Sequence, residues 1–295
     1  MRKHFHKKPN MYTSHVQLKV SNLTRSIEYY TTIIGFKVLE QTADIAYLTA
    51  DGKTSLVSLI EIQNAQPLRE GFTGLYHLAL LLPTRKDLGN IVQHFVELNV
   101  RLGASDHDVS EALYLNDPDG NGIEIYVDRD ESEWTWNEDG TVQMTTDRLN
   151  FQPILATADE KWDGLPQETV MGHVHLSVAN LPQSENFYTN VLDYRVVARY
   201  GAQALFISTG QYHHHFGLNT WQSANGQVPT ANMVGLNSFT IVLNDEQIAA
   251  KIKQELATNG YNTETYDAAP KFGGQQAFST MDPNGLRIIF TMDGE

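Results

Sequence analysis

The sequence predicts an α+β protein of two domains, each formed by a pair of β-α-β-β-β modules that share an open, cup-shaped mixed sheet. The first observation behind this prediction is internal repetition: the segment HVQLKVSNLTRSIEYYTTIIGFKV from His15 aligns with HVHLSVANLPQSENFYTNVLDYRV from His173. The second is another pair of similar segments, which begin at Leu75 and at Leu236. The chain therefore contains four units of about fifty residues.

Each unit begins with an apolar strand and continues into a single helix. In the first unit, apolar residues occupy every second position from Val16 to Val20, which is the period of a strand. In the second unit, apolar residues recur at helical spacing from Leu88 to Leu98, and Asp87 before them is a suitable N-cap. Short β-rich runs follow the helices of these two units, at residues 45–48, 56–62, 113–115 and 122–127.

A single helix covers only one face of a small sheet, so one unit cannot bury both faces by itself. Two consecutive units placed side by side solve this problem, because their joint sheet can curl into a cup with a protected interior. The expected boundaries are an N-terminal domain of residues 1–128, an acidic and weakly periodic linker of residues 129–170, and a C-terminal domain of residues 171–295.

The composition excludes several classes of protein. The chain has 35 Asp and Glu residues against 21 Lys and Arg residues, which argues against a nucleic-acid partner because phosphate binding needs clustered cations. It lacks both a run of about 20 apolar residues, which a membrane span needs, and the apolar stretch of a secretory signal, so we expect a cytoplasmic protein. Cysteine is absent, which leaves His, carboxylate and Tyr side chains to carry any chemistry.

Three residues form a candidate metal site. His15 begins the first strand of the first unit, His77 occupies the matching place in the second unit, and Glu124 lies on the last strand of the second unit between two isoleucines. Two imidazoles and one carboxylate form a facial triad that is typical of non-haem Fe(II) sites and leaves metal positions open. Each residue alone is better explained as a strand histidine or a solvated edge charge, and the matched placement of the three in a duplicated fold reverses this preference in favour of the metal site.

The stretch HDVSEALYLNDPDGNGIE, from His107 to Glu124, carries a resemblance to a known family. The chain resembles the vicinal oxygen chelate superfamily, which includes glyoxalases, bleomycin resistance proteins and extradiol dioxygenases, and within it the type I extradiol dioxygenases of the catechol 2,3-dioxygenase type. Ser105, two residues before His107, is the one departure from the family's pattern. The positions that match that pattern are His107, Leu113, Tyr114, Asp117, Pro118, Gly120 and Glu124.

The resemblance implies that Glu124, His15 and His77 bind Fe(II), with Mn(II), Zn(II) or Ni(II) as alternatives. It also implies that His107 and Tyr114 line the substrate and oxygen side, where they can exchange protons and hydrogen-bond to developing negative charge. Related two-domain enzymes have their metal in the C-terminal half and a catalytic His about fifteen residues before the second His ligand. Between His15 and His77 this chain has no histidine, which leaves that role to an amide side chain or water.

The C-terminal half has a less complete set of ligands. The places that match the three candidate ligands hold His173, Ser238 and Ile289, and an isoleucine cannot bind a metal. His214, in the run YHHHF, could meet His173 inside the second cup. These histidines form either a secondary metal or ligand site or a buried polar network in a degenerate cup, and the missing carboxylate favours the network.

The leading functional hypothesis is an Fe(II)-dependent extradiol ring-cleavage dioxygenase of aromatic catabolism, which acts on a catechol-type diol and O2. A glyoxalase-like metal isomerase is the first alternative, although that chemistry usually needs a second carboxylate near the metal, for which Glu61 is the candidate. A protein that sequesters a small molecule without catalysis is the second alternative, and it would not need the retained triad. A homo-oligomer is compatible with the sequence.

Overall fold

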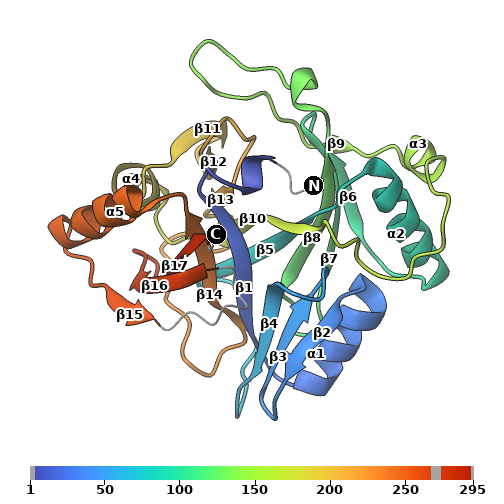
Figure 1. Ribbon diagram of the computed structural model, residues 1–295, viewed down its shortest axis with the longest axis horizontal. Coiled ribbons are helices and arrows are strands. Elements are labelled where there is room, and N and C mark those ends of the chain that lie inside the picture. Colours follow the sequence, from blue (N-terminus) through green and yellow to red (C-terminus); the bar gives the residue numbers. More distant parts are fainter. Residues whose placement is uncertain (1–3, 267–273, 294–295) are drawn as a thin grey trace.

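The computed structural model describes residues 4–266 and 274–293, and four β-α-β-β-β modules follow one another along the chain (Figure 1). The first module consists of β1 (Tyr12–Val20), α1 (Leu23–Tyr29) with its π-helical continuation η2 (Tyr30–Ile34), β2 (Lys37–Gln41), β3 (Ile45–Thr49) and β4 (Ser55–Glu61). The second consists of β5 (Gly74–Leu81), α2 (Arg85–Glu97), β6 (Gly103–Asp106), β7 (Ser110–Asn116) and β8 (Gly122–Asp128). These elements confirm the predicted module and fold class.

The second half of the chain repeats this order. The third module consists of β10 (Val170–Ser177), α4 (Leu181–Asn186) with its continuation η4 (Phe187–Val191), β11 (Arg195–Tyr200), β12 (Ala204–Ser208) and β13 (Phe216–Asn219). The fourth consists of β14 (Gly235–Leu243), α5 (Glu246–Thr258), β15 (Glu264–Tyr266), β16 (Gly274–Met281) and β17 (Arg287–Asp293). Outside the modules lie η1 (His4–His6), η3 (Glu131–Glu133), β9 (Asp147–Arg148) and α3 (Phe151–Leu155).

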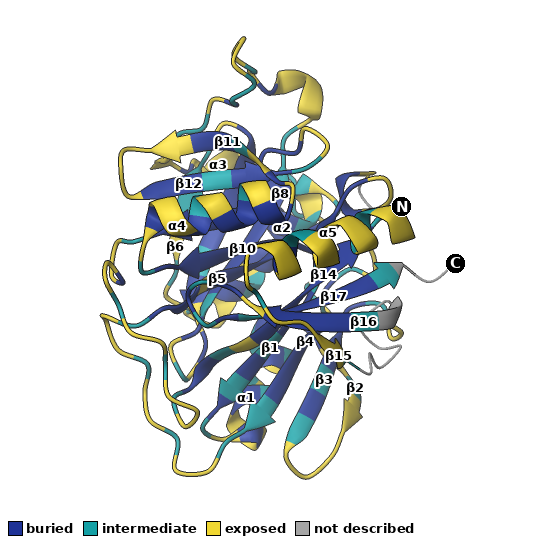
Figure 2. Cartoon of the chain, turned by 90° about the vertical axis from the view of Figure 1, so that its left-hand side faces the viewer, coloured by how far each residue is buried: buried dark blue, intermediate teal, exposed yellow. Residues whose placement is uncertain are grey.

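The strands form two mixed sheets. One has eight strands in the order β15-β16-β17-β14-β1-β4-β3-β2, and the other has nine in the order β11-β12-β13-β10-β5-β8-β7-β6-β9. Helices α1 and α2 lie on one side of the molecule and α4 and α5 on the opposite side, so the sheets occupy the middle (Figure 1). The strands are largely buried, whereas α4 and α5 expose their outer faces (Figure 2).

The pairing of modules differs from the prediction. Strand β1 pairs antiparallel with β14, and β5 pairs antiparallel with β10, so the first module shares a sheet with the fourth and the second with the third. The expectation that consecutive modules form each cup is therefore wrong. The physical reason is that the first strands of all four modules carry similar apolar patterns, which specify the buried face of a strand but not its neighbour.

The segment between the two halves does more than connect them. Within the expected linker, β9 extends the nine-stranded sheet beside β6, and α3 packs beside α2. Trp134 and Val142 from the same segment pack with Phe5 and Tyr212 in a small apolar cluster. The chain therefore folds these residues against the sheet of the second and third modules.

The ends of the helices show how local sequence sets the elements. Helix α2 is capped by Thr84, whose hydroxyl accepts a hydrogen bond from the backbone N–H of Asp87. The expected cap, Asp87, instead lies in the first turn, where its negative charge favours the helix N-terminus. Helix α5 is followed by Gly260 with a φ of 79°, a left-handed position at which glycine avoids a side-chain clash.

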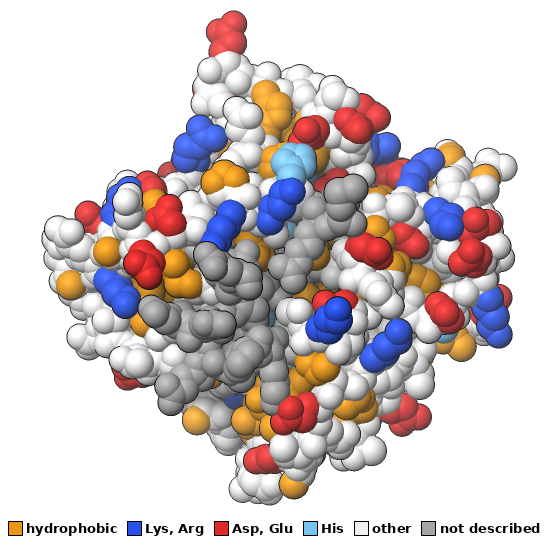
Figure 3. Space-filling model, viewed as in Figure 1, with side chains coloured by type: hydrophobic (Ala, Val, Ile, Leu, Met, Phe, Trp, Pro, Cys, Tyr) orange, Lys and Arg blue, Asp and Glu red, His pale blue; other side chains and the backbone are white. Residues whose placement is uncertain are grey.

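The described residues contain no helix that is both long enough and apolar enough to cross a membrane. On the face shown in Figure 3, acidic and basic side chains are interspersed and form no large basic patch.

Candidate metal centre

Three neighbouring strands of the nine-stranded sheet, β5, β8 and β10, supply the metal-type side chains. Ala79 on β5 lies level with Glu124 on β8 and with His173 on β10, while His77 lies level with His175. Because side chains alternate between the two faces of a strand, His77 shares the face of Ala79. The strand register therefore places His77, Glu124 and His173 on one face of one sheet.

The donor atoms of these three residues converge. The Oε2 atom of Glu124 lies 3.0 Å from His77 Nε2 and 3.1 Å from His173 Nε2, and the two Nε2 atoms are 3.4 Å apart. Two ligands at right angles on a divalent ion, each with a bond of about 2.1 Å, lie about 3.0 Å apart. The residues present therefore fit a divalent metal ion bound on one side, and among the described residues they form the one such convergent group.

The protonation states of the group suit a metal. Burial opposes the charge on Glu124, but the charges and hydrogen bonds of His173 and His77 outweigh it and hold the pKa of Glu124 well below its usual range. Burial lowers the pKa of His173, against the opposing effect of Glu124. An ionised carboxylate and a neutral imidazole are the forms that bind metal ions.

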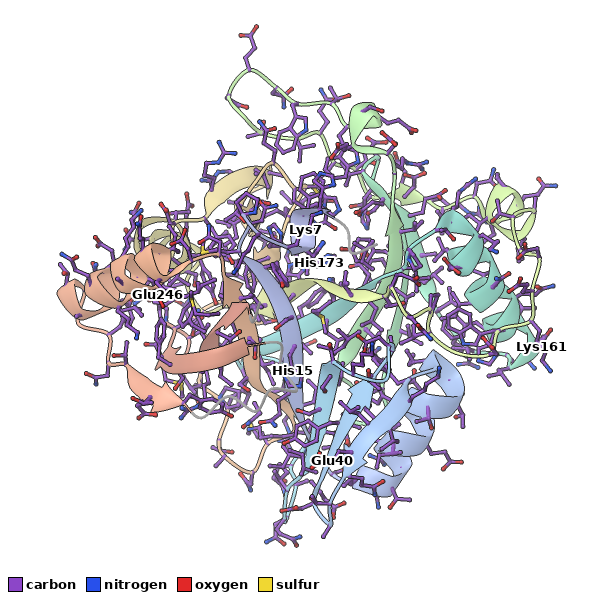
Figure 4. The ribbon with its side chains drawn as sticks, viewed as in Figure 1. Lys7, His15, Glu40, Lys161, His173 and Glu246 are labelled. Atoms are coloured by element: carbon purple, nitrogen blue, oxygen red, sulfur yellow. The ribbon has the colours of Figure 1, made fainter. Side chains whose placement is uncertain are left out.

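His15, an expected ligand, is not part of this group. It lies on β1 in the eight-stranded sheet, level with Thr240 on β14, whereas His173 lies on β10 (Figure 4). Burial lowers the pKa of His15 to about 3. The predicted set of His15, His77 and Glu124 is thus corrected in one member: β10, not β1, is the neighbour of β5, so His173 takes the place that the sequence prediction gave to His15.

His173 was expected in a secondary or degenerate site, and a signal for its real place was available in the sequence. The interval between His15 and His77 contains no histidine, whereas three consecutive histidines follow His173 at positions 213–215. That contrast indicates which of the two matching strands contributes to the site. The degenerate positions fall together instead in the other sheet, where His15 is level with Thr240, and Thr240 with Ile289.

A β-bulge at Gly172 shapes the strand that carries His173. In the pairing of β10 with β5, Met171 and His173 oppose consecutive residues, so Gly172 is the extra residue. A Cβ atom on Gly172 would lie 2.0 Å from the hydroxyl oxygen of Tyr126, and the Gly172 carbonyl accepts a hydrogen bond from His6 Nε2 at 2.7 Å. Only a glycine fits between these two groups.

The two residues expected beside the metal, His107 and Tyr114, form a hydrogen-bonded pair. His107 Nδ1 lies 2.6 Å from the carbonyl oxygen of Thr145, to which it can only donate, and His107 Nε2 lies 2.6 Å from the Tyr114 hydroxyl. The ring centroids of Tyr114 and His77, one of the three convergent residues, are 5.6 Å apart. Burial and then the charge of Glu124 raise the pKa of Tyr114 well above its usual value, so its hydroxyl keeps its proton.

A second polar chain approaches the three convergent residues from the loop between β12 and β13. The rings of His214 and His173 have centroids 4.1 Å apart, and His214 Nδ1 lies 2.8 Å from His213 Nδ1. His213 Nε2 lies 2.9 Å from Asp128 Oδ1, and a carboxylate accepts this hydrogen bond. With His213 neutral, its Nδ1 must then accept from the Nδ1–H of His214, which leaves His214 Nε2 as a proton acceptor. Sequence reasoning named His214 but had no means of linking it to Asp128.

The three metal-type side chains open into a large cleft. Its volume is about 1460 Å³, and its lining includes His107, Tyr114, His175 and His214 as well as the three convergent residues. Residues of the expected linker, such as Met144 and Thr145, form part of its wall. The group therefore has one side held by the sheet and another accessible to a small molecule.

Comparison with known proteins agrees with this fold. The family model of the Glyoxalase/Bleomycin resistance protein/Dioxygenase superfamily matches residues 13–125 and 170–290. A protein named catechol-2,3-dioxygenase from Bacillus subtilis (strain 168) is 43% identical over 282 residues, which cover 94% of this chain and 96% of that protein.

Solved structures show the same fold at low sequence identity. A Bacillus subtilis crystal structure has a TM-score of 0.69 at 14% identity and covers 98% of this chain and 87% of its own. Maize glyoxalase I has a TM-score of 0.55 at 16% identity, with coverage of 96% and 92%. The chain therefore belongs to the Glyoxalase/Bleomycin resistance protein/Dioxygenase superfamily and is a homologue of a catechol-2,3-dioxygenase over nearly its whole length.

Proposed function

We propose that this protein is an extradiol ring-cleavage dioxygenase that uses Fe(II) held by His77, Glu124 and His173 to open catechol-type diols with O2. The observation that carries the proposal is the convergence of two histidine nitrogens and one carboxylate oxygen at 3.0 to 3.4 Å on the wall of an open cleft. A facial set of this composition leaves adjacent metal positions for a diol and for O2. The 43% identity to a protein named catechol-2,3-dioxygenase supports the substrate class.

The chemistry of the donors supports Fe(II) over other ions. Imidazole and carboxylate ligands also suit Mn(II), Zn(II) and Ni(II), but Fe(II) combines this donor set with the ability to react with O2. His77, Glu124 and His173 would hold the metal, which would supply Lewis-acid and redox chemistry when bound. The protein's own groups would manage the protons and the developing charge.

His214 is the group that we assign to accept a proton from the diol. Asp128 and His213 hold it in the form with a free Nε2 lone pair, and its ring lies beside that of the ligand His173. This residue fills the acid-base role that the interval between His15 and His77 left vacant. Burial lowers its pKa well below the usual range, so the ring is neutral at neutral pH and a nitrogen lone pair is free.

His107 and Tyr114 are assigned to the oxygen side of the site. Neutral His107 accepts the single hydroxyl proton of Tyr114 at Nε2, because its Nδ1–H is donated to Thr145. When His107 is doubly protonated, its Nε2–H donates to the Tyr114 oxygen, and the Tyr114 proton can then be donated to negative charge that develops on oxygen. His107 can take up or release the corresponding proton, because the Thr145 carbonyl holds only its Nδ1–H. His214 would thus accept a proton from the diol, whereas His107 and Tyr114 would act on the charge that develops on oxygen.

The alternative of a glyoxalase-like isomerase lacks its second carboxylate. Glu61, the candidate for that place, lies on β4 of the other sheet, and its Oε2 accepts a hydrogen bond of 2.6 Å from the backbone N–H of Leu23 at the start of α1. The convergent group of the described residues contains one carboxylate, Glu124. A sequestering protein would likewise have no need for three convergent ligands.

The test is metal analysis of anaerobically purified protein followed by a screen of catechols under 18O2. We expect about one Fe(II) per chain and a yellow ring-opened product that contains both atoms of labelled oxygen. Product with one labelled oxygen atom, or turnover that requires Zn(II) or Ni(II) instead of iron, would contradict the proposal.

A further inference from the structure

Three exposed aromatic side chains line the cleft. The exposed fractions of Tyr76, Trp221 and Tyr200 are 37%, 38% and 59%, and within residues 4–266 and 277–292 no other Phe, Trp or Tyr is exposed. All three belong to the lining of the cleft that contains the metal ligands. Large apolar side chains that gather at one exposed place commonly mark a binding surface.

The three rings continue a row of rings that starts at the metal ligands. The ring centroids of His77 and His175 are 4.9 Å apart, and His175 is in turn 4.9 Å from Tyr76 and 5.4 Å from Trp221. The Tyr76 and Trp221 rings are 5.1 Å apart, and Tyr200 follows at 6.5 Å from Trp221. A ligand bound at the metal could therefore extend along this row towards solvent.

The backbone is shaped so that Tyr76 joins the row. In the pairing of β5 with β10, His77 opposes His175 while Leu75 opposes the next residue, Leu176, so Tyr76 is the extra residue of a β-bulge. Regular alternation would place Tyr76 and His77 on opposite faces of the sheet. The bulge removes that alternation, and both rings contact His175.

The geometry and charge of this end of the cleft suit a flat apolar group. Trp221 meets Tyr76 and Tyr200 at interplanar angles of 69° and 88°, which leaves ring faces available at a corner for stacking. The guanidinium of Arg199, beside Tyr200, is paired with Glu185 through two hydrogen bonds and is thus already neutralised. The cleft volume of about 1460 Å³ also far exceeds the needs of a single ring.

We propose that Tyr76, Trp221 and Tyr200 form a subsite, called here the aromatic corner, for an apolar substituent on the diol ring. The preferred substrates are then catechols that carry an aryl or similarly flat apolar group. This inference rests on the proposed function, because it takes the diol to be held at His77, Glu124 and His173.

The first test compares catechol with a phenyl-substituted catechol in the iron-loaded protein. Replacing Trp221→Ala should lower the ratio of kcat/KM for the phenyl-substituted substrate to that for catechol about tenfold, mainly through KM, because a stacking partner is lost. Trp221→Phe keeps a ring and should retain most of the ratio. Val96→Ala, which removes an exposed side chain of α2 outside the cleft, should not change it. An unchanged ratio in Trp221→Ala would overturn the proposal.

A second measurement separates this inference from the proposed function. 2-Phenylphenol has one hydroxyl and cannot be cleaved as a diol, so its affinity, measured by calorimetry, reports the aromatic corner without turnover. Weaker binding to Trp221→Ala and Tyr76→Ala supports the subsite even if the protein cleaves no catechol. Cleavage of catechols together with unaltered binding of 2-phenylphenol would reject the subsite alone. A change of oligomeric state in these variants without a change in affinity would likewise reject it, because the rings would then form a subunit interface.

Discussion

At the residue scale, the site depends on a choice between two histidines that match in sequence. His15 and His173 begin equivalent strands, and both are buried. Only His173 approaches Glu124 and His77 within 3.4 Å. A ligand and a buried strand histidine can therefore be distinguished by the effect of their removal on metal content.

We expect His173→Ala to lower the metal content at least tenfold, because one of three convergent donors is lost. His15→Ala is the matched variant, since it removes the same side chain from the equivalent strand, and it should retain the metal stoichiometry of the wild type. Metal analysis of folded fractions, checked by circular dichroism, gives the comparison. Loss of metal from His15→Ala, with retention in His173→Ala, would restore the ligand set expected from the sequence.

Asp128 is predicted to act through His213 on His214 without contact to the substrate. The variant Asp128→Asn keeps the size of the side chain but removes the charge that holds His213 Nε2–H. We expect kcat to fall about tenfold or more while metal content stays near that of the wild type, because a hydrogen bond to a charged group is weakened. Tyr212→Phe, which loses a longer hydrogen bond of 3.2 Å to Asp128 and the hydrogen bond to the Tyr126 hydroxyl but keeps the charge of Asp128, should have a smaller effect on kcat. Equal losses of kcat in the two variants would count against this role.

At the scale of secondary-structure elements, two β-bulges between β5 and β10 shape the site. One lies at Gly172 and sets the strand that carries His173, and the other lies at Tyr76 and places a second ring beside His175. Bulges interrupt the regular alternation of side chains, so a pattern of apolar residues along the strand does not reveal them. The position of each bulge is a property of the strand pair.

Gly172→Ala tests the first bulge. The added Cβ atom would meet the Tyr126 hydroxyl at 2.0 Å in a buried place, so either the strand or Tyr126 must move. We expect the free energy of unfolding to fall by about 1–3 kcal/mol and metal affinity to fall with it. Gly103→Ala on β6 is the control, because its Cβ would have its nearest contact at an ordinary 3.6 Å. Urea denaturation of both variants decides the outcome, and equal stability of the two would show that the bulge tolerates a side chain.

At the scale of the whole molecule, the folded chain buries many of its histidines. Burial lowers the pKa of His6 from 6.5 to about 4 and that of His15 to about 3. In the unfolded chain these imidazoles titrate near 6.5, so below that pH the unfolded state binds more protons than the folded state. Above about pH 6.5 these imidazoles are neutral in both states and do not change the free energy of unfolding with pH. As the pH falls from about 6.5 towards their pKa values in the folded state, the free energy of unfolding decreases.

The fold should accordingly be sensitive to mild acid. At pH 5, one imidazole that stays neutral in the folded state costs about 2 kcal/mol of stability relative to neutral pH. Replacing His15→Gln removes one such group, so the loss of unfolding free energy between pH 7 and pH 5 should shrink by about that amount. The exposed His4, replaced in the same way, serves as the control and should leave the difference unchanged. Urea titrations at the two pH values measure it, and an equal loss in His15→Gln and wild type would refute the assignment.

The sequence by itself determined the number of modules, the order of their elements, and two members of the convergent group, His77 and Glu124, whereas His107 and Tyr114 were implied by the family resemblance. These depend on local patterns, because alternation, helical spacing and a turn before a strand are properties of neighbouring residues. For residues that are far apart in the chain, the sequence provided only the similarity between repeats. Such similarity identifies equivalent places and does not say which of them meet.

Only the tertiary structure decided that β5 pairs with β10, which brings His173 to the metal group and leaves His15 in the other sheet. The same pairing set the two bulges, the approach of His214 to His173, and the hydrogen bond from His213 to Asp128. The physical reason is that four first strands of similar pattern can pair in several ways at little local cost. The choice among them is made by the packing of the whole chain, which no short segment encodes.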